Sequence, residues 1–236
     1  MSTHPLDVAP VPLSAQQRRL LERYVELLLT WNRRMNLTAA TSPEEIYTRH
    51  LLDALTLVPL VEARLVPKRL VDVGSGAGLP GVPLAVARPA WHVTLVEATG
   101  KKVRFLETVV DELGLTNVRV QHGRAEAVAH EPDHRQQYDV ATARAVAKLP
   151  VLVELCLPFV RVGGYVMAPK GPDPEEELKV ATRALARLGG RIEEVLPVQV
   201  PGLSGARTVI VIHKVRSTPQ QYPRPPGRPA KRPLGA

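Results

Sequence analysis

The first 60 residues of the chain carry apolar side chains at helical spacing. Ser14 and Gln17 have the form of a capping box, a common start of a helix. After them an apolar residue recurs every three or four positions, with charged residues on the other faces. These apolar residues are Leu20, Leu21, Tyr24, Leu27, Leu28 and Trp31. The pattern predicts one long amphipathic helix.

A second helix start follows at Ser42, which can act as the cap. Pro43 fits the first helical position, and Glu45 can reach back to the cap. We predict a helix over residues 43–59. Two helices bury little apolar surface on their own, so we expect residues 1–68 to form a helical cap that packs onto the rest of the chain.

From Arg69 onward, short apolar runs alternate with helical segments. The runs predict strands at 70–73, 92–96, 118–121, 139–142 and 165–168. The helical segments lie at about 79–88, 101–113, 149–160 and 175–188. Alternation of strands and helices predicts right-handed crossovers and a mainly parallel, doubly wound α/β sheet.

Two further strands are predicted near residues 192–198 and 208–214. The link between them, around Pro201–Gly205, is too short to hold a crossover helix. The two strands should therefore form an antiparallel hairpin at one edge of the sheet. The result is a seven-stranded, Rossmann-like domain over residues 69–214.

Length and composition indicate a globular protein of one domain, or of one domain with a small partner. The chain has 236 residues, of which 44% are hydrophobic and 23% charged. Cys156 is the single cysteine and no Cys/His pair has zinc-ligand spacing, so we expect neither a disulfide nor a structural metal. No apolar stretch approaches about 20 residues and no export signal is evident, so we expect a cytoplasmic protein without a membrane span.

The net charge of +8 is concentrated at the carboxyl terminus. Residues 1–70 hold 9 basic and 7 acidic side chains, residues 71–212 hold 16 of each, and residues 213–236 hold 6 basic and none acidic. Residues 215–236 thus form a basic, proline-rich tail. Such a tail suits a polyanion such as RNA, and it equally suits a solvated disordered end.

The first strand of the α/β part runs into a glycine-rich loop, Gly74–Gly81. Ligands of such sheets bind beyond the carboxyl ends of the strands, so this loop is the candidate ligand site. Residues 76–81 match the G-x-G-x-x-G pattern of dinucleotide sites. Asp72, just before the loop, would repel a pyrophosphate and attract the sulfonium and amino groups of S-adenosylmethionine. Asp72 therefore favours the methyl donor.

Two acidic residues follow the next two predicted strands. Glu97 stands 19 residues beyond Gly78, a spacing that suits hydrogen bonds to ribose hydroxyls in either cofactor. Glu126, in Gly123–Glu126, could read an adenine edge together with a backbone N–H. Glu126 could also be a charge on a short solvated helix.

The residues after the fourth strand bear on the methyl acceptor. Residues 139–145 lack the Asn/Asp-Pro-Pro-aromatic motif of adenine amino-group methylation. Cys156 lies in an apolar helix, where we expect a core residue and not a nucleophile. Guanine N7 needs no general base, and Arg144 and Lys170 could direct donors at guanine O6. Either one could also be a surface charge.

Taken together, these segments resemble the bacterial 16S ribosomal RNA guanine-N7 methyltransferases, the glucose-inhibited division protein B family. The resemblance implies a class I methyltransferase fold, S-adenosylmethionine as donor, and a guanine of 16S rRNA, in the small ribosomal subunit, as acceptor. It is carried, in chain order, by Trp31-Asn32, Asn36–Thr38, Arg49–Asp53, Asp72–Gly81, Lys101–Leu106, Ala143–Ala145, Lys170-Gly171 and Tyr222–Arg224.

The resemblance also assigns site residues. It places cofactor contacts on Gly74 and Leu79, on Glu97, Ala98 and Thr99, on Ala125 and Glu126, and on Arg144. Asp72 and Gly76 join this set from the loop argument above. Ala98 and Thr99 depart from the residues that the family often has there. The resemblance further implies that residues 222–234 form an ordered RNA contact. We expect a monomer.

The predicted cap has residues with simpler interpretations. Asn36 can end the first helix in a left-handed turn. Arg49 can pair with Asp53 across one helical turn, which favours a structural role for His50 and Asp53. A second hypothesis is that the cap, through Arg33 and Arg34, helps present the RNA.

The leading interpretation is an RNA guanine-N7 methyltransferase in which Arg144 and Lys170 face the base. The alternatives are a small-molecule methyltransferase on the same sheet, and a non-catalytic NAD- or RNA-binding module. A small-molecule enzyme has little use for a cationic tail. A binding module has little use for Asp72, Glu97 and Glu126 converging on one loop.

Overall fold

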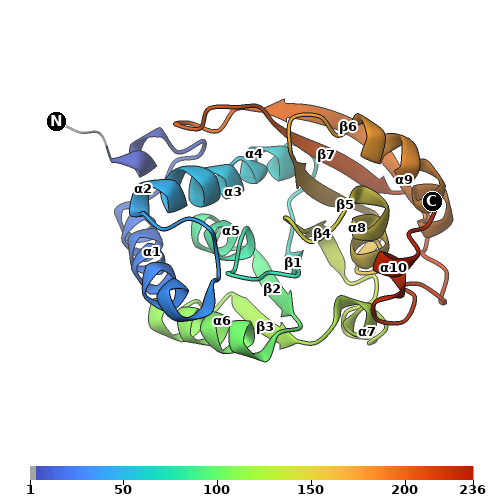
Figure 1. Cartoon of the computed structure of the whole chain (residues 1–236), viewed down its shortest axis with the longest axis horizontal. Helices are drawn as coiled ribbons and strands as arrows, with labels where there is room; N and C mark the ends of the chain where they lie inside the picture. Colours follow the sequence, from blue (N-terminus) through green and yellow to red (C-terminus); the bar gives the residue numbers. More distant parts are fainter. Residues whose placement is uncertain (1–3, 236) are drawn as a thin grey trace.

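A seven-stranded sheet runs through the centre of the molecule, as the computed structural model of residues 4–235 shows (Figure 1). The strand order is β3-β2-β1-β4-β5-β7-β6. Strands β1 to β5 run parallel, and β7 lies antiparallel between β5 and β6. The strands are β1 Arg69–Val73, β2 His92–Glu97, β3 Val118–His122, β4 Tyr138–Thr142, β5 Val160–Lys170, β6 Gly190–Val198 and β7 Arg207–Lys214. The predicted fold class, including the terminal antiparallel hairpin, is confirmed.

The central strands are apolar on both faces because helices cover both faces. In β1, Leu70 contributes to the core on one side of the sheet and Val71 to the core on the other, and both are fully buried. Complete burial of one such side chain stabilises the fold by about 1.5–3 kcal/mol. The pattern of β1 thus fixes the three-layer arrangement.

The amino-terminal helices cover one face together with two helices of the α/β part. Near the amino terminus lies the short 3-10 turn η1, Pro5–Val8. The helices on this face are α1 Ala15–Met35, α2 Pro43–Ile46, α3 Asp53–Leu55, α4 Leu57–Glu62, α5 Gly81–Ala87 and α6 Gly100–Leu113. Helix α1 packs against both α5 and α6, and all of them share one hydrophobic cluster. The helical cap therefore shares its core with the sheet.

The predicted second helix is wider in its middle than a regular α-helix. A π-helical turn, η2, occupies Tyr47–Leu52 between α2 and α3. The prediction of one regular helix over 43–59 is wrong in this respect, and the helical backbone continues to Glu62 with a break in α-geometry at Thr56. Single π turns inside helices are frequent at functional sites. This turn carries His50 to the pocket described below.

The other face of the sheet is covered by later parts of the chain. The helices there are α7 Ala125–Val128, α8 Leu149–Cys156, α9 Glu175–Leu188 and α10 Arg228–Lys231. Cys156 is completely buried in this core, and burial raises the pKa of its thiol. The thiol is therefore protonated and inert, as expected of a core cysteine.

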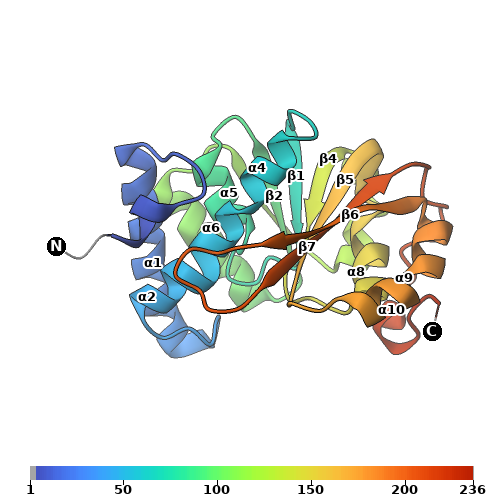
Figure 2. The ribbon, with the colours of Figure 1, turned by 90° about the horizontal axis from the view of Figure 1, so that it is seen from above.

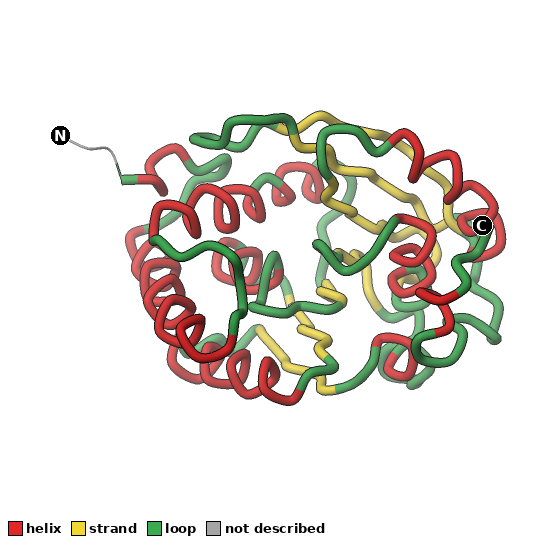
Figure 3. Tube along the Cα trace, viewed as in Figure 1, coloured by secondary structure: helices red, strands yellow, loops and turns green. Residues whose placement is uncertain are grey.

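The basic tail folds back onto this second layer, mostly as loop (Figure 3). Tyr222 and Leu234 are buried, and the Arg224 guanidinium pairs with the fully buried Glu154 at 2.6 Å. Lys214, at the end of β7, donates to the Leu157 carbonyl at 2.7 Å. The tail is an ordered part of the fold, so the interpretation as a solvated disordered end is wrong.

Within residues 4–235, the helices are each too short or too polar to cross a lipid bilayer.

Candidate functional site

The turn after β1 has a backbone that only glycine adopts without strain. Gly74, Gly76 and Gly78 have φ angles of 72°, 58° and 87°. A side chain at Gly74 would come within 2.8 Å of Val146, whereas a Cβ at Gly76 would meet nothing closer than 3.8 Å. The loop is therefore packed against Val146 at Gly74, whereas the space beside Gly76 is free.

Asp72 lies beneath this loop and not on the wall of a pocket. It is fully buried, and its Oδ2 accepts a hydrogen bond from Gly81 N at 2.9 Å, at the first turn of α5. Its Oδ1 accepts no hydrogen bond from the described residues. Burial raises the pKa of Asp72 to about 7. Repulsion of a pyrophosphate by Asp72 is therefore weaker near neutral pH than the sequence argument assumed.

Glu97 joins the glycine loop to the turn after β2. Its Oε2 accepts from Gly76 N at 2.9 Å and its Oε1 accepts from Thr99 N at 2.7 Å. The Glu97 carbonyl also accepts from Gly123 N at 2.9 Å. Each carboxylate oxygen has a second lone pair that can accept a further donor, such as a hydroxyl. The ends of β1, β2 and β3 thus meet at Glu97.

A pocket of about 800 Å³ opens between this loop and the helical cap. Its wall includes Gly74, Gly76 and Leu79 from the loop. Residues after β4 and β5 and residues of the cap complete the wall. Five basic side chains and one acidic side chain line it, namely Arg49, Lys102, Arg144, Lys170, Arg207 and Asp53. Arg144 pairs with Asp53, Lys170 with Glu177 and Arg49 with Glu45, which leaves Lys102 and Arg207 without a salt bridge among residues 4–235. These two cations give the pocket a positive surplus that attracts anions.

Arg144 is the most heavily bonded cation of this pocket. It donates from Nη1 to Asp53 Oδ2 at 2.8 Å and to the Arg49 carbonyl at 3.2 Å, and from Nη2 to His50 Nδ1 at 3.1 Å. A guanidinium has five N–H donors, so these contacts use three. The other two, on Nε and Nη2, have no acceptor among residues 4–235 and remain for a ligand.

His50 is neutral in this arrangement. Burial, followed by the Arg144 charge, lowers its pKa to about 4. Nδ1 lies 3.1 Å from Arg144 Nη2 and 3.0 Å from the Arg49 carbonyl oxygen, and Nε2 lies 2.6 Å from Thr38 Oγ1. The tautomer with its proton on Nε2 lets Nδ1 accept from Arg144. His50 therefore orients Arg144 without adding a positive charge.

Lys170 lines the pocket but its ammonium is held by neighbouring groups. It donates to Glu177 Oε2 at 2.7 Å and to the Ala147 carbonyl at 3.0 Å. Glu177 also accepts from Leu149 N at 2.6 Å, at the start of α8. Lys170 has one N–H left for a ligand. The structure thus brings Arg144 and Lys170 to one pocket, as predicted, and gives both of them protein partners.

The remaining predicted cofactor residues lie outside this pocket wall, at the neighbouring strand ends. Ala98 and Thr99 follow β2, and the Ala98 carbonyl lies 3.2 Å from His122 Nε2 at the end of β3. Ala125 and Glu126 begin α7. Glu126 Oε1 accepts from Gly227 N at 2.9 Å, so the tail reaches this position. These residues form a second group, which Glu97 joins to the loop.

Several contacts of the site escape sequence analysis. The buried Tyr24 hydroxyl donates to the Ala77 carbonyl at 2.6 Å and so ties α1 to the glycine loop. The β6–β7 hairpin extends toward the cap (Figure 2), where a Cβ at Gly202 would lie 3.1 Å from Thr48. Arg207, the first residue of β7 after the hairpin loop, lines the pocket. In the sequence, Tyr24 is simply one residue of the apolar face of the first helix, so nothing in the local pattern indicates its hydrogen bond to the loop.

The expected pairing of Arg49 with Asp53 is wrong. Asp53 pairs with Arg144, and the nearest carboxylate to Arg49 is Glu45 at 3.8 Å. The signal that would have helped is the apolar surrounding of Asp53, since a carboxylate among apolar residues needs a cation from elsewhere. Asn36 ends α1 with a φ of 50°, as predicted, and Arg33 and Arg34 in the last turn are exposed.

The GidB family model, described as rRNA small subunit methyltransferase G, matches residues 17–204. The chain belongs to this family. Proteins named ribosomal RNA small subunit methyltransferase G are similar over nearly the whole chain. The one from Roseiflexus castenholzii is 50% identical, with 94% of each chain covered, and the one from Chloroflexus aggregans is 48% identical, with 95% of this chain and 93% of the relative covered.

Solved structures share the fold at low sequence identity. A mutant of MtNAS in complex with S-adenosylmethionine is similar with a TM-score of 0.56 and 17% identity, over 85% of this chain and 76% of that one. The precorrin-6y C5,15-methyltransferase from Geobacter metallireducens is similar with a TM-score of 0.51 and 17% identity, over 69% and 87%. The sheet of this family member is thus the one that methyltransferases of other specificity also use.

Proposed function

We propose that the protein transfers a methyl group from S-adenosylmethionine to N7 of a guanine in 16S rRNA. The observation that carries the proposal is one pocket in which the glycine loop meets five basic side chains and one acidic one. The glycine loop suits a nucleoside cofactor, and the excess of positive charge in the pocket suits a polyanion such as RNA. The proteins named rRNA small subunit methyltransferase G, at up to 50% identity, support the same substrate class.

The residues fit the cofactor by their chemistry. Gly76 presents its backbone to open space, since a Cβ there would meet nothing closer than 3.8 Å. Glu97 offers carboxylate oxygens to ribose hydroxyls. We assign cofactor contacts to Gly74, Gly76 and Leu79 in the loop, and to Glu97, Ala98, Thr99, Ala125, Glu126 and Arg144. Asp72, predicted as a contact, lies fully buried beneath the loop and supports it through Gly81 N.

When bound, S-adenosylmethionine supplies a methyl group activated by a sulfonium. Guanine N7 already has a free lone pair, so the pocket needs no general base. The free N–H donors of Arg144 and Lys170 suit guanine O6 and hold N7 in line with the methyl carbon. One C–S bond breaks and one C–N bond forms, with no proton transferred. Catalysis is then alignment and exclusion of water by the cap.

The test is methyl transfer to small ribosomal subunits that lack the modification. The protein is incubated with methyl-labelled donor, and the labelled RNA is treated with borohydride and aniline, which cleave at N7-methylguanine. Cleavage at one labelled guanine of 16S rRNA is expected. Label on a base amino group, on ribose or only on small metabolites would overturn the acceptor assignment. Calorimetric binding of NAD without binding of S-adenosylmethionine would overturn the cofactor assignment.

We further propose that the chain acts as a monomer in the cytoplasm without a structural metal. Helices of the same chain cover both faces of the central strands, and the two hydrophobic cores are built from this chain alone. Cys156 is the single cysteine of the chain and cannot form an intramolecular disulfide, which suits a reducing compartment. Light scattering of the purified protein should give the mass of one 25.8 kDa chain, and chelators should leave its unfolding temperature unchanged.

A further inference from the structure

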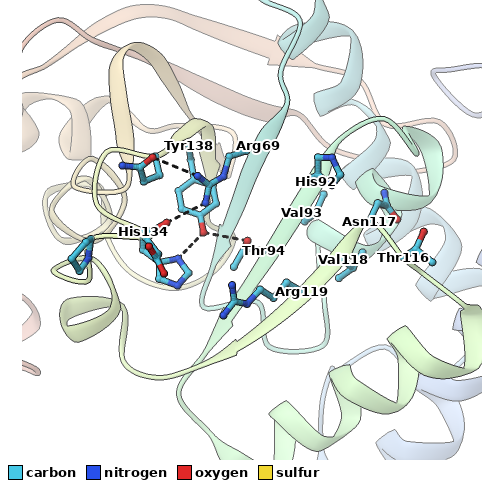
Figure 4. A pocket seen from close by; sticks show the side chains of 13 residues that line it. Arg69, His92, Val93, Thr94, Thr116, Asn117, Val118, Arg119, His134 and Tyr138 are labelled. Carbon is cyan, nitrogen blue, oxygen red and sulfur yellow. Dashed lines mark hydrogen bonds between the residues drawn. The ribbon is translucent and has the colours of Figure 1, made fainter.

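A second pocket, of about 460 Å³, lies at the edge of the sheet opposite to the glycine loop (Figure 4). Residues at or near the starts of four parallel strands line it: Arg69 of β1, His92 of β2, Val118 of β3 and Tyr138 of β4. The two edges are about 17 Å apart, since a strand rises about 3.3 Å per residue over five steps. Nothing in the proposed methyl transfer uses this edge.

The pocket exists because one face of β3 is left to solvent. The crossover from β3 to β4 contains only the four-residue helix α7. Strand β3 accordingly alternates, with Val118 and Val120 packed against the cap-side core and Arg119 exposed on the other face. The floor of the pocket is therefore polar, unlike the faces that helices cover.

The polar floor is rigid. The Tyr138 hydroxyl lies 2.7 Å from His134 Nδ1 and 3.2 Å from Thr94 Oγ1, and both Tyr138 and His134 are buried. The Arg69 guanidinium lies over the Tyr138 ring, 4.8 Å from its centre, and donates to the Asp133 carbonyl at 3.1 Å. These groups satisfy one another and leave a preformed surface.

Arg119 differs from these neighbours because it has no partner. It is exposed, and no residue from 4 to 235 accepts a hydrogen bond or forms a salt bridge with its guanidinium; Figure 4 draws none to it. Asp133 is the single acidic side chain in the lining, against the two cations Arg69 and Arg119. An unpaired guanidinium on a rigid polar floor suits a phosphate, which it can bind with two parallel N–H donors.

We propose that this pocket binds a backbone phosphate of the RNA substrate through Arg119. The inference rests on the proposed function, which supplies the RNA. Arg124, exposed and also without a partner among the described residues, follows the other end of β3. The five steps from Arg119 to Arg124 span at most about 17 Å, a length that a few nucleotides of RNA cover. RNA lying along the open edge of β3 would thus connect this pocket with the transfer site.

The test compares Arg119→Ala with Arg187→Ala, which removes another exposed arginine, from the last turn of α9. Affinity for a 16S rRNA fragment is measured by fluorescence anisotropy at several salt concentrations. Arg119→Ala should weaken binding by about 3- to 10-fold and reduce the slope of log affinity against log salt by about 0.7–0.9, the share of one phosphate contact. Equal behaviour of the two variants would overturn the inference.

A second measurement uses inorganic phosphate and needs no RNA. Amide signals of Thr94 and Tyr138 should shift on titration of the wild type and of Arg187→Ala, and should not shift in Arg119→Ala. Absence of any shift would overturn the site. A shift without an RNA effect of Arg119→Ala would overturn the RNA assignment and identify a pocket for a free phosphate ester.

The two proposals fail separately. A protein that methylates 16S rRNA while Arg119→Ala behaves as Arg187→Ala retains the proposed function and loses only this inference. A protein that binds RNA through Arg119 without transferring a methyl group retains the site and loses the proposed reaction.

Discussion

Arg144 Nη1 donates to Asp53 Oδ2 at 2.8 Å across 91 positions of sequence. The side chains are only 16% and 10% exposed. Arg144 follows β4 and Asp53 begins α3, so the contact joins the sheet to the helical cap at the pocket itself. This ion pair therefore helps to hold the cap on the sheet, and together with the Arg49 carbonyl and His50 it sets the direction of the free Arg144 donors.

Replacing Asp53 by Asn should release Arg144 from its position. The change keeps the size of the side chain and removes its charge, which leaves a mostly buried guanidinium without a counter-ion. We expect the free energy of unfolding to fall by about 1–3 kcal/mol. We expect kcat/KM for RNA methylation to fall by about 10- to 100-fold, because Arg144 no longer points at the base.

Denaturant unfolding and initial rates of methyl transfer measure the two effects. Glu107→Gln, an exposed acid of α6, is the control for loss of one negative charge and should change neither. Wild-type rates for Asp53→Asn would show that the ion pair is not part of the site.

His50 should contribute an acid sensitivity to the fold. The pKa of His50 is lowered from 6.5 to about 4 by burial, so the unfolded chain binds more protons than the folded chain between these pH values. Stability from this group therefore rises with pH through that window and is complete above about pH 6.5. Its size is at most about 3 kcal/mol, from 1.36 kcal/mol per unit.

The measurement is urea unfolding of the wild type and of His50→Gln at pH 4.5, 5.5 and 7. The variant should lose part of the stability gain that the wild type shows over this range. A parallel pH dependence of the two proteins would contradict a neutral, buried His50.

Gly76 and Gly114 offer a matched test of the glycine loop. Their φ angles are 58° and 61°, and a Cβ at either position meets nothing closer than 3.8 Å. Replacement by Ala should therefore cost each variant about 1–2 kcal/mol of stability through the same backbone strain. Gly114 caps the far end of α6, so only Gly76→Ala should weaken S-adenosylmethionine binding.

Calorimetric titration of the donor into the two variants decides the point. We expect at least about a 10-fold higher Kd for Gly76→Ala than for Gly114→Ala, which is about 1.4 kcal/mol. Equal donor affinity in the two variants would remove Gly76 from the cofactor site.

Short-range sequence patterns predicted the strands and helices of this protein but not the contacts between the helical cap and the sheet. The strand sequences, the capping box at Ser14 and the left-handed turn at Asn36 are local, because neighbours in sequence decide them. The pair of Asp53 and Arg144 depends on how the cap lies on the sheet. No sequence spacing encodes that geometry.

Glu154 shows how such a contact can still leave a trace. It is the single acid within the apolar helix α8. The structure shows that it is fully buried and holds Arg224 of the tail. A carboxylate in an apolar run implies a distant cation, although the sequence cannot say which of 31 basic residues supplies it.

Tyr24→Phe should weaken the attachment of the glycine loop to α1. The variant removes the hydrogen bond to the buried Ala77 carbonyl and nothing else of the side chain. The expected loss of stability is about 0.5–1.5 kcal/mol, with a several-fold weaker affinity for the donor.

Tyr165→Phe is the control for this change. The Tyr165 hydroxyl makes no hydrogen bond within residues 4–235, and its ring stacks on His213 at 4.9 Å. Donor titration and thermal unfolding of both variants provide the comparison. An equal effect of the two changes would assign the loss to the ring environment and not to the loop contact.

Arg224 and Glu154 should make unequal contributions when one of them is removed. Glu154 is completely buried and accepts from Arg224 N, Nε and Nη2 at 2.9, 2.8 and 2.6 Å. Arg224→Ala leaves a buried carboxylate with only a backbone donor, so we expect a loss of about 3–5 kcal/mol. Glu154→Gln leaves a cation that can turn to water, so its loss should be smaller. Arg224→Lys keeps the charge but not the paired N–H donors, so its loss of stability should lie between those of the other two variants.

Denaturant unfolding ranks the three variants, and cleavage within residues 215–235 by a protease specific for Lys and Arg reports release of the tail. A larger loss of stability for Glu154→Gln than for Arg224→Ala would contradict the view that Arg224 compensates the cost of burying the Glu154 carboxylate.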